Sequence, residues 1–456
     1  MAPTEWPLLT TSTMPSQQPS REFFTTRPGF ILAAAGSAVG LGNMWRFSYQ
    51  AAEGGGAAFV ILYVLLTFLI GMPIMVSEFA IGRTTRRSPI GAYRAIGGKV
   101  WAPVGFLAVL APLIILSYFS VISGWTLRYA VDGLVGFSSD FAGRFTEISS
   151  GRSAVFYHLI LMAVTIAIVL GGVRKGIQRA SLILMPMLLL LLIGLVAWAA
   201  TLPDSATGYA FYLKPSIDAL LDPTVIRQAA TQAFLSLSVG MGVMITYASY
   251  LDKTHDLSQE AVAVSALDFS VAFIGGLVVF PVIFAFGLSG QISESTVGTL
   301  FISLPAAFFE LGVVGQFVGA IFFVALLVAA LTSAISLLEV VVASLMDELK
   351  WSRRTSALTA GTIAALTGVV PALSQEALGL MDKVASEVIV VAGALGSLLL
   401  AGWMLKDPVG NIRAGASSLF RRIVPGLLIA IRYLAPAFVA IVLWYGIKDI
   451  ISIISG

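Results

Sequence analysis

The sequence contains no cysteine and only two histidines, His158 and His255, in 456 residues. The absence of cysteine excludes a disulfide framework, a thiolate nucleophile and a cysteine-ligated metal site. Two histidines are too few to make a histidine metal centre or a Ser-His catalytic relay a good expectation. We therefore do not expect an enzyme. Charged residues make up only 11% of the chain and the net charge is +3. The basic residues form no patch for nucleic acid, which excludes that class of partner.

Long apolar runs dominate what is present. Hydrophobic residues make up 58% of the chain, with 28 Phe and 8 Trp, and the mean hydropathy is +0.93. A soluble domain of this size does not have such a composition. Apolar runs long enough to cross a bilayer predict eleven helices, near residues 28–50, 57–81, 103–133, 153–172, 178–201, 228–251, 260–288, 312–346, 356–373, 384–404 and 424–447.

Lysine and arginine collect on one side of these predicted spans. Clusters follow the second, fourth, eighth and tenth spans, whereas the opposite side holds few basic residues. By the positive-inside rule the N-terminus is cytoplasmic and the C-terminus, after an odd number of spans, is extracellular. We therefore expect a multi-pass protein of a prokaryotic inner (plasma) membrane, with short helices near 134–152, 202–227 and 289–311 on the outer face.

Two of the predicted spans are interrupted by glycine and polar residues. Residues 36–46 read GSAVGLGNMWR in the first span, and residues 234–242 read FLSLSVGMG in the sixth. Irregular backbone survives at membrane depth only beside a cavity, because unpaired backbone groups are costly in hydrocarbon. Paired breaks in corresponding helices of two inverted halves indicate the binding site of a secondary transporter. The alternative is that the glycines merely allow close helix packing.

This pattern predicts five segments. They are a cytoplasmic tail over 1–26, a first repeat of helices 1–5 over 27–201, an extracellular loop over 202–227, an inverted second repeat of helices 6–10 over 228–404, and a cytoplasmic loop with helix 11 over 405–456.

Polar residues at middle depth indicate what the cavity holds. They are Asn43, Ser236, Asp268, Thr332 and Ser333. Polar groups in such positions are functional by default. Neutral carbonyls and hydroxyls with at most one or two carboxylates suit Na⁺ better than a divalent cation. A lone hydroxyl would more simply bond a carbonyl of its own helix, but the adjacent pair Thr332 and Ser333 favours ion ligation.

Several separated motifs resemble the neurotransmitter:sodium symporter family. They are Gly36 to Phe47, Glu53-Gly54-Gly55-Gly56, Ser249-Tyr250 and Leu331-Thr332-Ser333. The resemblance runs from Arg21 to Leu443 and is to bacterial eleven-helix members, such as tryptophan or hydrophobic amino-acid transporters. It implies an all-α polytopic membrane protein with the LeuT fold, a 5+5 inverted repeat with broken helices 1 and 6, plus an eleventh helix.

The resemblance also implies two sodium sites. One would use the Ala38 carbonyl, Asn43, Ser236, Asp268 and the substrate carboxylate. The other would use the carbonyls of Gly36, Val39 and Ala329 and the hydroxyls of Thr332 and Ser333. Most relatives have a neutral Asn where Asp268 stands, and the Ser that helps to bind chloride in animal members is Ala272 here. We therefore expect transport without a chloride requirement.

The substrate implied by the resemblance is an L-amino acid. Its site would comprise Ala38, Val39, Leu41, Gly42, Ile115, Phe119, Leu235, Ser236, Ser238, Met241 and Ser333. The flexible Met241 replaces a family Phe and can yield space to a ring, so a bulky hydrophobic or aromatic amino acid is expected, tryptophan or tyrosine first. Phe119 and Leu235 replace a carboxylate-binding Tyr and an aromatic lid, which makes the pocket more apolar and roomier.

Charged residues match the family's two gates. Arg46 and Asp382, with Gln232 nearby, would form the outer gate, and Arg21, Tyr250 and Asp347 the inner one. Two acids within spans, Glu78 and Glu339, are expected to tie broken helix ends to neighbouring helices. The sequence thus predicts a sodium-coupled symporter that works by alternating access as a monomer or weak dimer. A proton-coupled or exchange carrier of the same fold, and an ion channel or sensor, are the alternatives.

Overall fold

The computed structural model describes residues 22–44, 46–287 and 298–455, and within these ranges the chain is helical, with no strand. Nine continuous helices in the described ranges are long and apolar enough to cross a membrane. Helices bond almost every backbone group internally, which is why apolar runs take this form in hydrocarbon. In chain order the nine spans are α4 (Ala57–Leu66), η1 (Thr67–Gly71) and α5 (Met72–Thr85); η2 (Lys99–Trp101) and α7 (Ala102–Val135); α9 (Gly151–Leu170); η3 (Val173–Gln178) and α10 (Arg179–Ala199); α15 (Leu257–Ala285); α18 (Gly312–Leu349); α19 (Arg353–Thr367) and α20 (Val369–Leu373); α21 (Gln375–Lys383), η6 (Val384–Ile389), α22 (Val390–Leu399) and η7 (Leu400–Met404); and α24 (Ser418–Ile429), η8 (Ala430–Leu434) and α25 (Ala435–Ser455).

Two further spans are interrupted. The first consists of α1 (Arg27–Ala38), α2 (Leu41–Met44) and α3 (Arg46–Glu53), and the second of α13 (Pro223–Ser236) and α14 (Val243–Ala248). Together with the nine continuous spans, they account for the eleven that the apolar runs predict. Both interruptions fall inside the segments 36–46 and 234–242 that their glycine and polar residues single out.

The second interruption depends on unusual backbone angles. Ser238, Gly240 and Gly242 have φ values of 52°, 83° and 69°, in the left-handed region. A Cβ atom on Gly240 would lie 2.2 Å from the Val390 carbonyl oxygen. Glycine is therefore required at this position, both because of its φ and because α22 approaches so closely.

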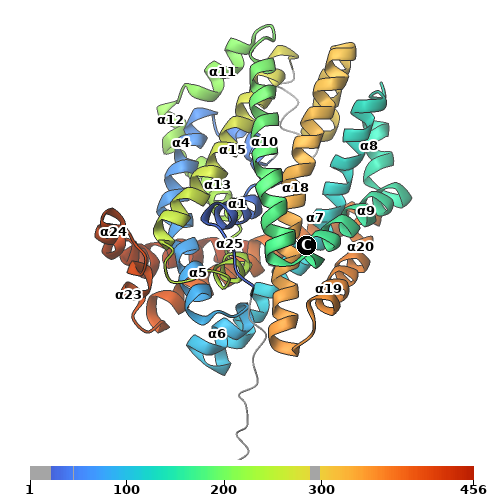
Figure 1. The fold of residues 1–456 in the computed structure, drawn as a ribbon. Coiled ribbons are helices and arrows are strands. Elements are labelled where there is room, and N and C mark those ends of the chain that lie inside the picture. The colour runs from blue at the N-terminus through green and yellow to red at the C-terminus, as the bar shows by residue number, and fades with distance from the viewer. Residues whose placement is uncertain (1–21, 45, 288–297, 456) are drawn as a thin grey trace, which may run out of the picture.

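Short helices cap the two ends of the bundle. At one end lie α8 (Phe141–Ser149), α11 (Ser205–Leu213), α12 (Ile217–Leu221), η5 (Thr299–Ser303) and α17 (Leu304–Glu310). These helices occupy the described parts of the loops expected on the outer face. At the other end lie α6 (Pro89–Gly97) and α23 (Pro408–Arg413), and Figure 1 shows α6 at the bottom and α11 at the top of the molecule.

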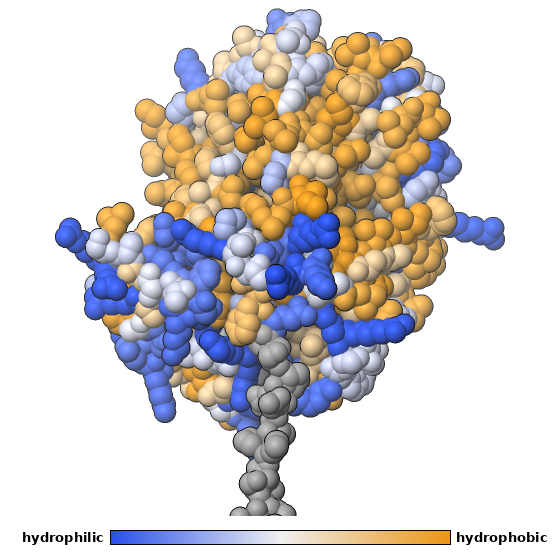
Figure 2. All heavy atoms as spheres, viewed as in Figure 1, coloured by the Kyte–Doolittle hydropathy of each residue, from blue (hydrophilic) through white to orange (hydrophobic). Residues whose placement is uncertain are grey.

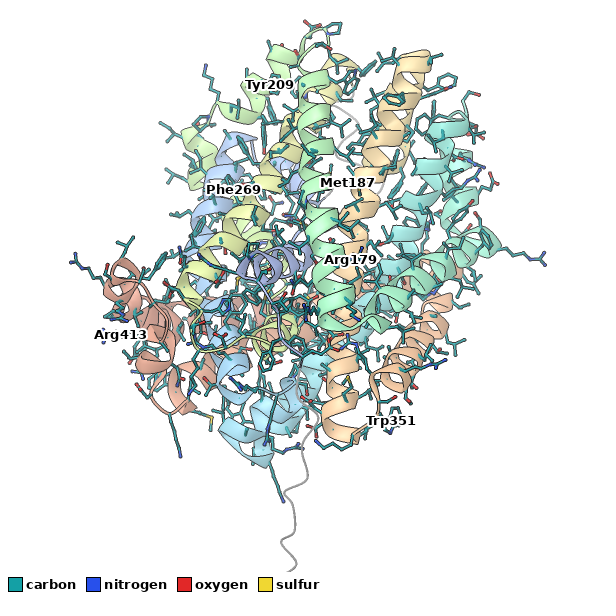
Figure 3. The ribbon with its side chains drawn as sticks, in the orientation of Figure 1. Arg179, Met187, Tyr209, Phe269, Trp351 and Arg413 are labelled. Carbon is teal, nitrogen blue, oxygen red and sulfur yellow. The ribbon has the colours of Figure 1, made fainter. Side chains whose placement is uncertain are left out.

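The long helix α18 forms the axis of the bundle. It packs against α7, α10, α9 and α1, and Figure 1 shows it running the height of the molecule beside α10. Around it, the surface in Figure 2 is largely hydrophobic in its upper part and hydrophilic below. Tyr209 and Trp351 mark opposite ends in Figure 3, and such aromatic residues favour membrane–water interfaces. The apolar band between them is the expected lipid-facing surface.

Candidate ion and substrate site

The first polar cluster lies where α2, α4, α13 and α15 meet. Asp268 is fully buried, and Ser236 Oγ lies 2.9 and 2.8 Å from its two carboxylate oxygens. Asn43 Nδ2 donates to Asp268 Oδ1 at 2.6 Å, and the Tyr63 hydroxyl donates to Oδ2 at 2.9 Å. Three donors from three other helices therefore converge on one buried carboxylate.

The same cluster is tied to the interruption of the first span. Asn43 Oδ1 accepts a hydrogen bond from Gly40 N at 2.9 Å, so one amide side chain joins the gap between α1 and α2 to Asp268. A buried carboxylate needs donors or a cation around it, because desolvation of the charge is costly. The oxygen atoms of Ser236 and Asp268 are ligands of the kind that a monovalent cation accepts, whereas Asn43 faces them with its amide nitrogen.

The second polar cluster lies between α1 and α18. Ser333 Oγ lies 3.5, 3.2, 3.1 and 3.3 Å from the carbonyl oxygens of Gly36, Ser37, Val39 and Ala329. A hydroxyl has one proton and can donate to only one of these oxygens at a time. The Ser37 and Ala329 carbonyls have further hydroxyl donors, Ser238 and Thr332, and the Gly36 and Val39 carbonyls share the Ser333 proton. Several carbonyl oxygens facing one hydroxyl form a setting that suits a small cation.

Helix geometry explains why the carbonyls of Gly36 and Ser37 are available. α1 ends at Ala38, so the carbonyls of its last turn have no partner further along the helix. The C-terminal end of a helix also carries the negative end of its dipole, which attracts cations. Thr332, in contrast, directs its hydroxyl to the Ala329 carbonyl of its own helix at 2.9 Å.

Serines fasten the two interrupted spans to each other. Ser238 Oγ donates to the Ser37 carbonyl at 2.8 Å, and Ser336 Oγ donates to Ser37 Oγ at 2.7 Å. The end of α1 is thus held by the interruption of the second span on one side and by α18 on the other. Both polar clusters sit on the backbone that these contacts position.

The residues expected to bind the substrate are mostly buried. Gly42, Phe119 and Leu235 are partly buried, and the others, Ala38, Val39, Leu41, Ile115, Ser236, Ser238, Met241 and Ser333, are buried. A Cβ atom on Gly42 would meet no atom within 4 Å. There is therefore open space beside the start of α2.

Glu78 ties the second interruption to its neighbours. Its Oε1 atom accepts from Gly240 N at 2.7 Å and from Ser397 Oγ at 3.2 Å. The Tyr93 hydroxyl lies 2.7 Å from Ser397 Oγ and 3.1 Å from the Gly393 carbonyl. The prediction that Glu78 holds a broken helix end is confirmed by the first of these contacts.

At the end of the bundle that we expect to face outward, Asp382 accepts a hydrogen bond from a tyrosine. Its Oδ1 accepts from the Tyr118 hydroxyl at 2.8 Å, and from Ser386 Oγ at 3.0 Å. Among the described residues no ion pair within 4 Å joins Asp382 to Arg46. Gln232 Nε2 donates to the Gly42 carbonyl at 3.4 Å, so it lies beside the start of α2.

At the end that we expect to face inward, two of the expected gate residues make hydrogen bonds between helices. The Tyr250 hydroxyl donates to Glu339 Oε1 at 2.7 Å, and Asp347 Oδ2 accepts from Ser88 N at 2.6 Å. Arg353 Nη2 pairs with Glu339 at 2.5 Å, so this acid links the end of α14 to α19. The third expected gate residue, Arg21, lies outside the described residues.

The segment before α1 seals the same end. Phe24 N donates to the Tyr250 carbonyl at 3.4 Å, and the Phe24 ring meets the Tyr250 ring edge-on. Gln178, in η3, exchanges two hydrogen bonds with Thr25, at 3.0 and 2.8 Å. Arg27 pairs with the buried Glu260 at 2.9 Å. The described part of this end is therefore closely packed.

Tyr63 is a site residue that the sequence reasoning missed. It lies in an apolar run of α4 and is fully buried, and its hydroxyl oxygen also lies 3.0 Å from Ser236 Oγ. The signal that could have found it is its hydroxyl, because a buried tyrosine hydroxyl requires a partner. The Ser37 carbonyl and Ser336 were missed in the same way.

Fold and site together define a class of protein. A bundle of apolar helices, with two interrupted spans meeting around cation-attracting oxygens at its centre, is the architecture of a secondary membrane transporter. The model of the sodium:neurotransmitter symporter family matches residues 21–139 and 145–453. The chain belongs to this family, and it is a transporter of the membrane and not an enzyme.

Individual relatives agree with this assignment. A sodium-dependent transporter of Bacillus subtilis is 37% identical over 84% of this chain and 87% of its own, and one of Methanocaldococcus jannaschii is 35% identical over 84% and 82%. Among solved structures, the crystal structure of MhsT in complex with L-phenylalanine superposes on this chain with a TM-score of 0.83. The match covers 93% of this chain and 100% of the MhsT chain, with 39% sequence identity. The fold is therefore the LeuT fold, as the sequence predicts.

Proposed function

We propose that this protein is a sodium-coupled symporter that carries a hydrophobic or aromatic L-amino acid across the plasma membrane by alternating access. The observation that carries the proposal is the meeting of both interrupted spans at two oxygen-rich clusters, around Asp268 and around Ser333. A solute bound between them would touch both interrupted spans at once. Its binding would therefore favour one arrangement of the two halves, 27–201 and 228–404.

The two clusters are proposed as two sodium sites. Asn43, Ser236 and Asp268, with the Ala38 carbonyl and the substrate carboxylate, would hold one ion. The carbonyls of Gly36, Val39 and Ala329, with Thr332 and Ser333, would hold the other. If the substrate carboxylate is a ligand of the first ion, ion and substrate each raise the affinity of the other, which is the basis of coupled transport.

The substrate proposal rests on the shape and polarity of the centre. The structure of MhsT contains L-phenylalanine, and this chain is 39% identical to it. Val39, Ile115 and Met241 give the surroundings an apolar character, and Gly42 leaves space beside the start of α2. We propose an aromatic amino acid, tryptophan or tyrosine first, with its carboxylate toward the backbone N–H groups of Leu41 and Gly42.

Chloride independence follows from the fixed charge of Asp268. The carboxylate stands in the first cluster with Tyr63 and Ser236, and four residues later Ala272 offers no hydroxyl. A protein carboxylate there supplies the negative charge that a bound anion would otherwise supply. The transporter should therefore need sodium but not chloride.

Uptake into proteoliposomes tests these proposals. We expect concentrative uptake of the amino acid that is lost when choline replaces sodium and unchanged when gluconate replaces chloride. Asp268→Asn should lower uptake at least tenfold and make the remainder chloride-sensitive, whereas the surface change Asp218→Asn should have no effect. An absolute chloride requirement of the unaltered protein would contradict chloride independence. Uptake that persists in choline would favour the proton-coupled or exchange carrier, and flux that does not saturate would favour a channel.

The gates and the setting complete the proposal. Arg46, Asp382 and Gln232 would close the outer path, and Arg21, Tyr250 and Asp347 the inner one. The close packing of Phe24 against Tyr250 supports a state in which the inner path is shut. We further propose a cytoplasmic N-terminus, an extracellular C-terminus and a monomer or weak dimer in the bilayer.

A further inference from the structure

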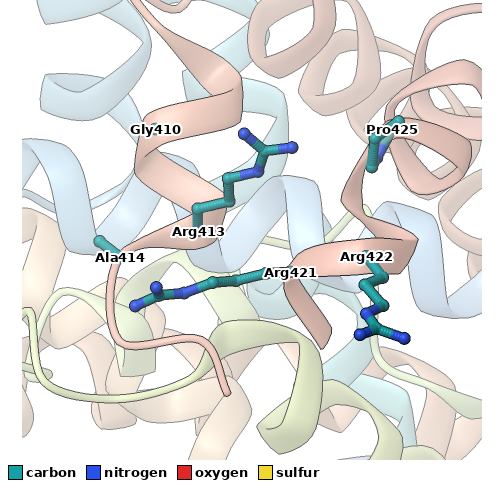
Figure 4. A pocket seen from close by; sticks show the side chains of 6 residues that line it. All are labelled: Gly410, Arg413, Ala414, Arg421, Arg422 and Pro425. Carbon is teal, nitrogen blue, oxygen red and sulfur yellow. The ribbon is translucent and has the colours of Figure 1, made fainter. Parts of the chain in front are cut away.

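We propose that a three-arginine cavity between α23 and α24 binds the phosphate-bearing headgroup of an anionic phospholipid. This cavity is a surface pocket that is largely open, has a volume of about 610 Å³ and is lined by Gly410, Arg413, Ala414, Arg421, Arg422 and Pro425. Figure 4 shows Arg413 reaching from the end of α23 into the space beside α24, with Arg421 extending beneath it toward Ala414. The proposal concerns a site separate from the transport centre.

The positive charge of the cavity is not balanced by the protein. In the part of the chain that the structure describes, no acidic side chain lies within 4 Å of the guanidinium groups of Arg413, Arg421 or Arg422. Arg421 Nε donates to the Ala416 carbonyl at 2.9 Å, which leaves its two terminal nitrogens for another acceptor. Asp407, at the start of α23, is used to cap Gly410 N at 2.9 Å.

The chemistry of the lining favours phosphate. A guanidinium group presents paired donors that match two oxygens of a phosphate, which a lysine ammonium cannot do. Three such groups around one cavity exceed what a single phosphodiester neutralises. A headgroup with one or more net negative charges is thus the ligand that fits. A zwitterionic headgroup fits less well, because the three arginines repel its positively charged group.

The position of the cavity selects a lipid over a soluble phosphate. α24 continues through η8 into α25 as one membrane span, Ser418–Ser452. On α24 the apolar side chains Leu419, Ile423 and Ile429 are 67%, 41% and 62% exposed. Apolar side chains and arginines on one short helix are typical of the membrane interface, where the chains of a lipid cover the former and its headgroup meets the latter.

The α23 end of the cavity is held in place by a buried arginine. Arg83, only 3% exposed, donates to the carbonyls of His255 at 2.7 Å and Ala414 at 3.2 Å, and also to that of Asn411. Ala414 is itself part of the cavity lining. The cavity is therefore built on a fixed backbone, and a ligand there need not order a loose loop.

Binding of defined lipids to the purified full chain tests the proposal. In neutral detergent, phosphatidylglycerol should raise the melting temperature saturably, whereas phosphatidylcholine should not. Replacing Arg413, Arg421 and Arg422 with Ala should weaken phosphatidylglycerol binding at least about tenfold, since each basic residue near an anionic surface is worth about fivefold. Sodium-dependent amino-acid binding reports that the variant is folded.

A matched variant and a second measurement distinguish binding at this cavity from a general effect of net charge. Arg174, Arg179 and Arg354 are also exposed on the basic side, and replacing all three with Ala makes the same change in net charge. That control should retain phosphatidylglycerol binding. In the unaltered protein, a photoreactive phosphatidylglycerol should label the segment 408–425. Equal loss in both triple variants, equal stabilisation by phosphatidylcholine, equal binding of inorganic phosphate, or labelling only elsewhere would each overturn the proposal.

Discussion

Four backbone carbonyls converge on the Ser333 side chain, and α18 offers a matched control for it. Ser344, further along the same helix, simply donates to the Val340 carbonyl at 2.8 Å. Ser333→Ala should lower sodium affinity about tenfold or more, because an interaction with a charged group contributes about 1.5–3 kcal/mol. Ser344→Ala should change it less than twofold.

Sodium titration of amino-acid binding to the purified protein measures both effects. The loss in Ser333→Ala should appear as a shifted sodium midpoint with the maximal binding preserved. If both variants shift the midpoint equally, or neither does, the four carbonyls around Ser333 do not form an ion site.

The members of the first cluster differ in how visible they are in the sequence. Asn43, Ser236 and Asp268 could be predicted, because polar residues are conspicuous within apolar spans. Tyr63 could not, because its ring fits an apolar run and the partner of its hydroxyl is known only once α4, α13 and α15 are placed together. The carbonyl of Ser37 is likewise invisible, since a backbone oxygen leaves no trace in residue identity.

At the scale of a single element, the second interruption should be sensitive to one methyl group. Gly240→Ala places a residue with a Cβ at φ 83° and brings that atom within 2.2 Å of the Val390 carbonyl oxygen. A left-handed backbone alone costs about 1–2 kcal/mol for a residue with a side chain. We expect a loss of at least about 2 kcal/mol in stability.

Gly194 provides the comparison within the same protein. It lies inside α10, and a Cβ atom there would meet nothing within 4 Å. Gly194→Ala should be neutral or stabilising by up to about 1 kcal/mol, because alanine favours a helix. Thermal unfolding of the two variants in detergent gives the answer, and a Gly240→Ala protein as stable as Gly194→Ala would show that the interruption tolerates a side chain.

The positions of the spans could be predicted because hydropathy alone determines them, but their ends could not. Sequence reasoning assigns 36–46 to the first interruption, whereas α1 continues to Ala38 and α2 already begins at Leu41. The gap is short because Asn43 Oδ1 bonds Gly40 N and so restarts the helix at once. The second interruption is wider, since every second residue from Ser238 to Gly242 has a positive φ, which a helix cannot accommodate.

At the scale of the whole molecule, the distribution of basic residues predicts which end faces the cytoplasm. Because the chain contains no cysteine, a thiol reagent should not label the unaltered protein, and any labelling of a variant reports its introduced cysteine. Asp218→Cys, on the exposed part of α12, should react with an impermeant maleimide in intact cells. Arg354→Cys, at the start of α19, should react only after the membrane is permeabilised.

Labelling of the two single-cysteine variants is read by gel shift, with the unaltered chain as the blank. Both variants must retain sodium-dependent uptake for the result to count. The reverse labelling pattern would contradict the proposed orientation of the termini.

The ion ligands that we propose at the end of α1 are main-chain atoms, and this has a genetic consequence. No point substitution can delete the carbonyls of Gly36, Ser37 or Val39, so drift in their side chains does not remove the ion ligands. Only changes that alter the course of the backbone can, as at Gly36, where a Cβ atom would lie 3.2 Å from Thr332 Cβ and 3.3 Å from Met185 Sδ. In a screen of random variants, the substitutions in this segment that inactivate the protein should therefore be those that add a bulky side chain, whether that side chain is polar or apolar.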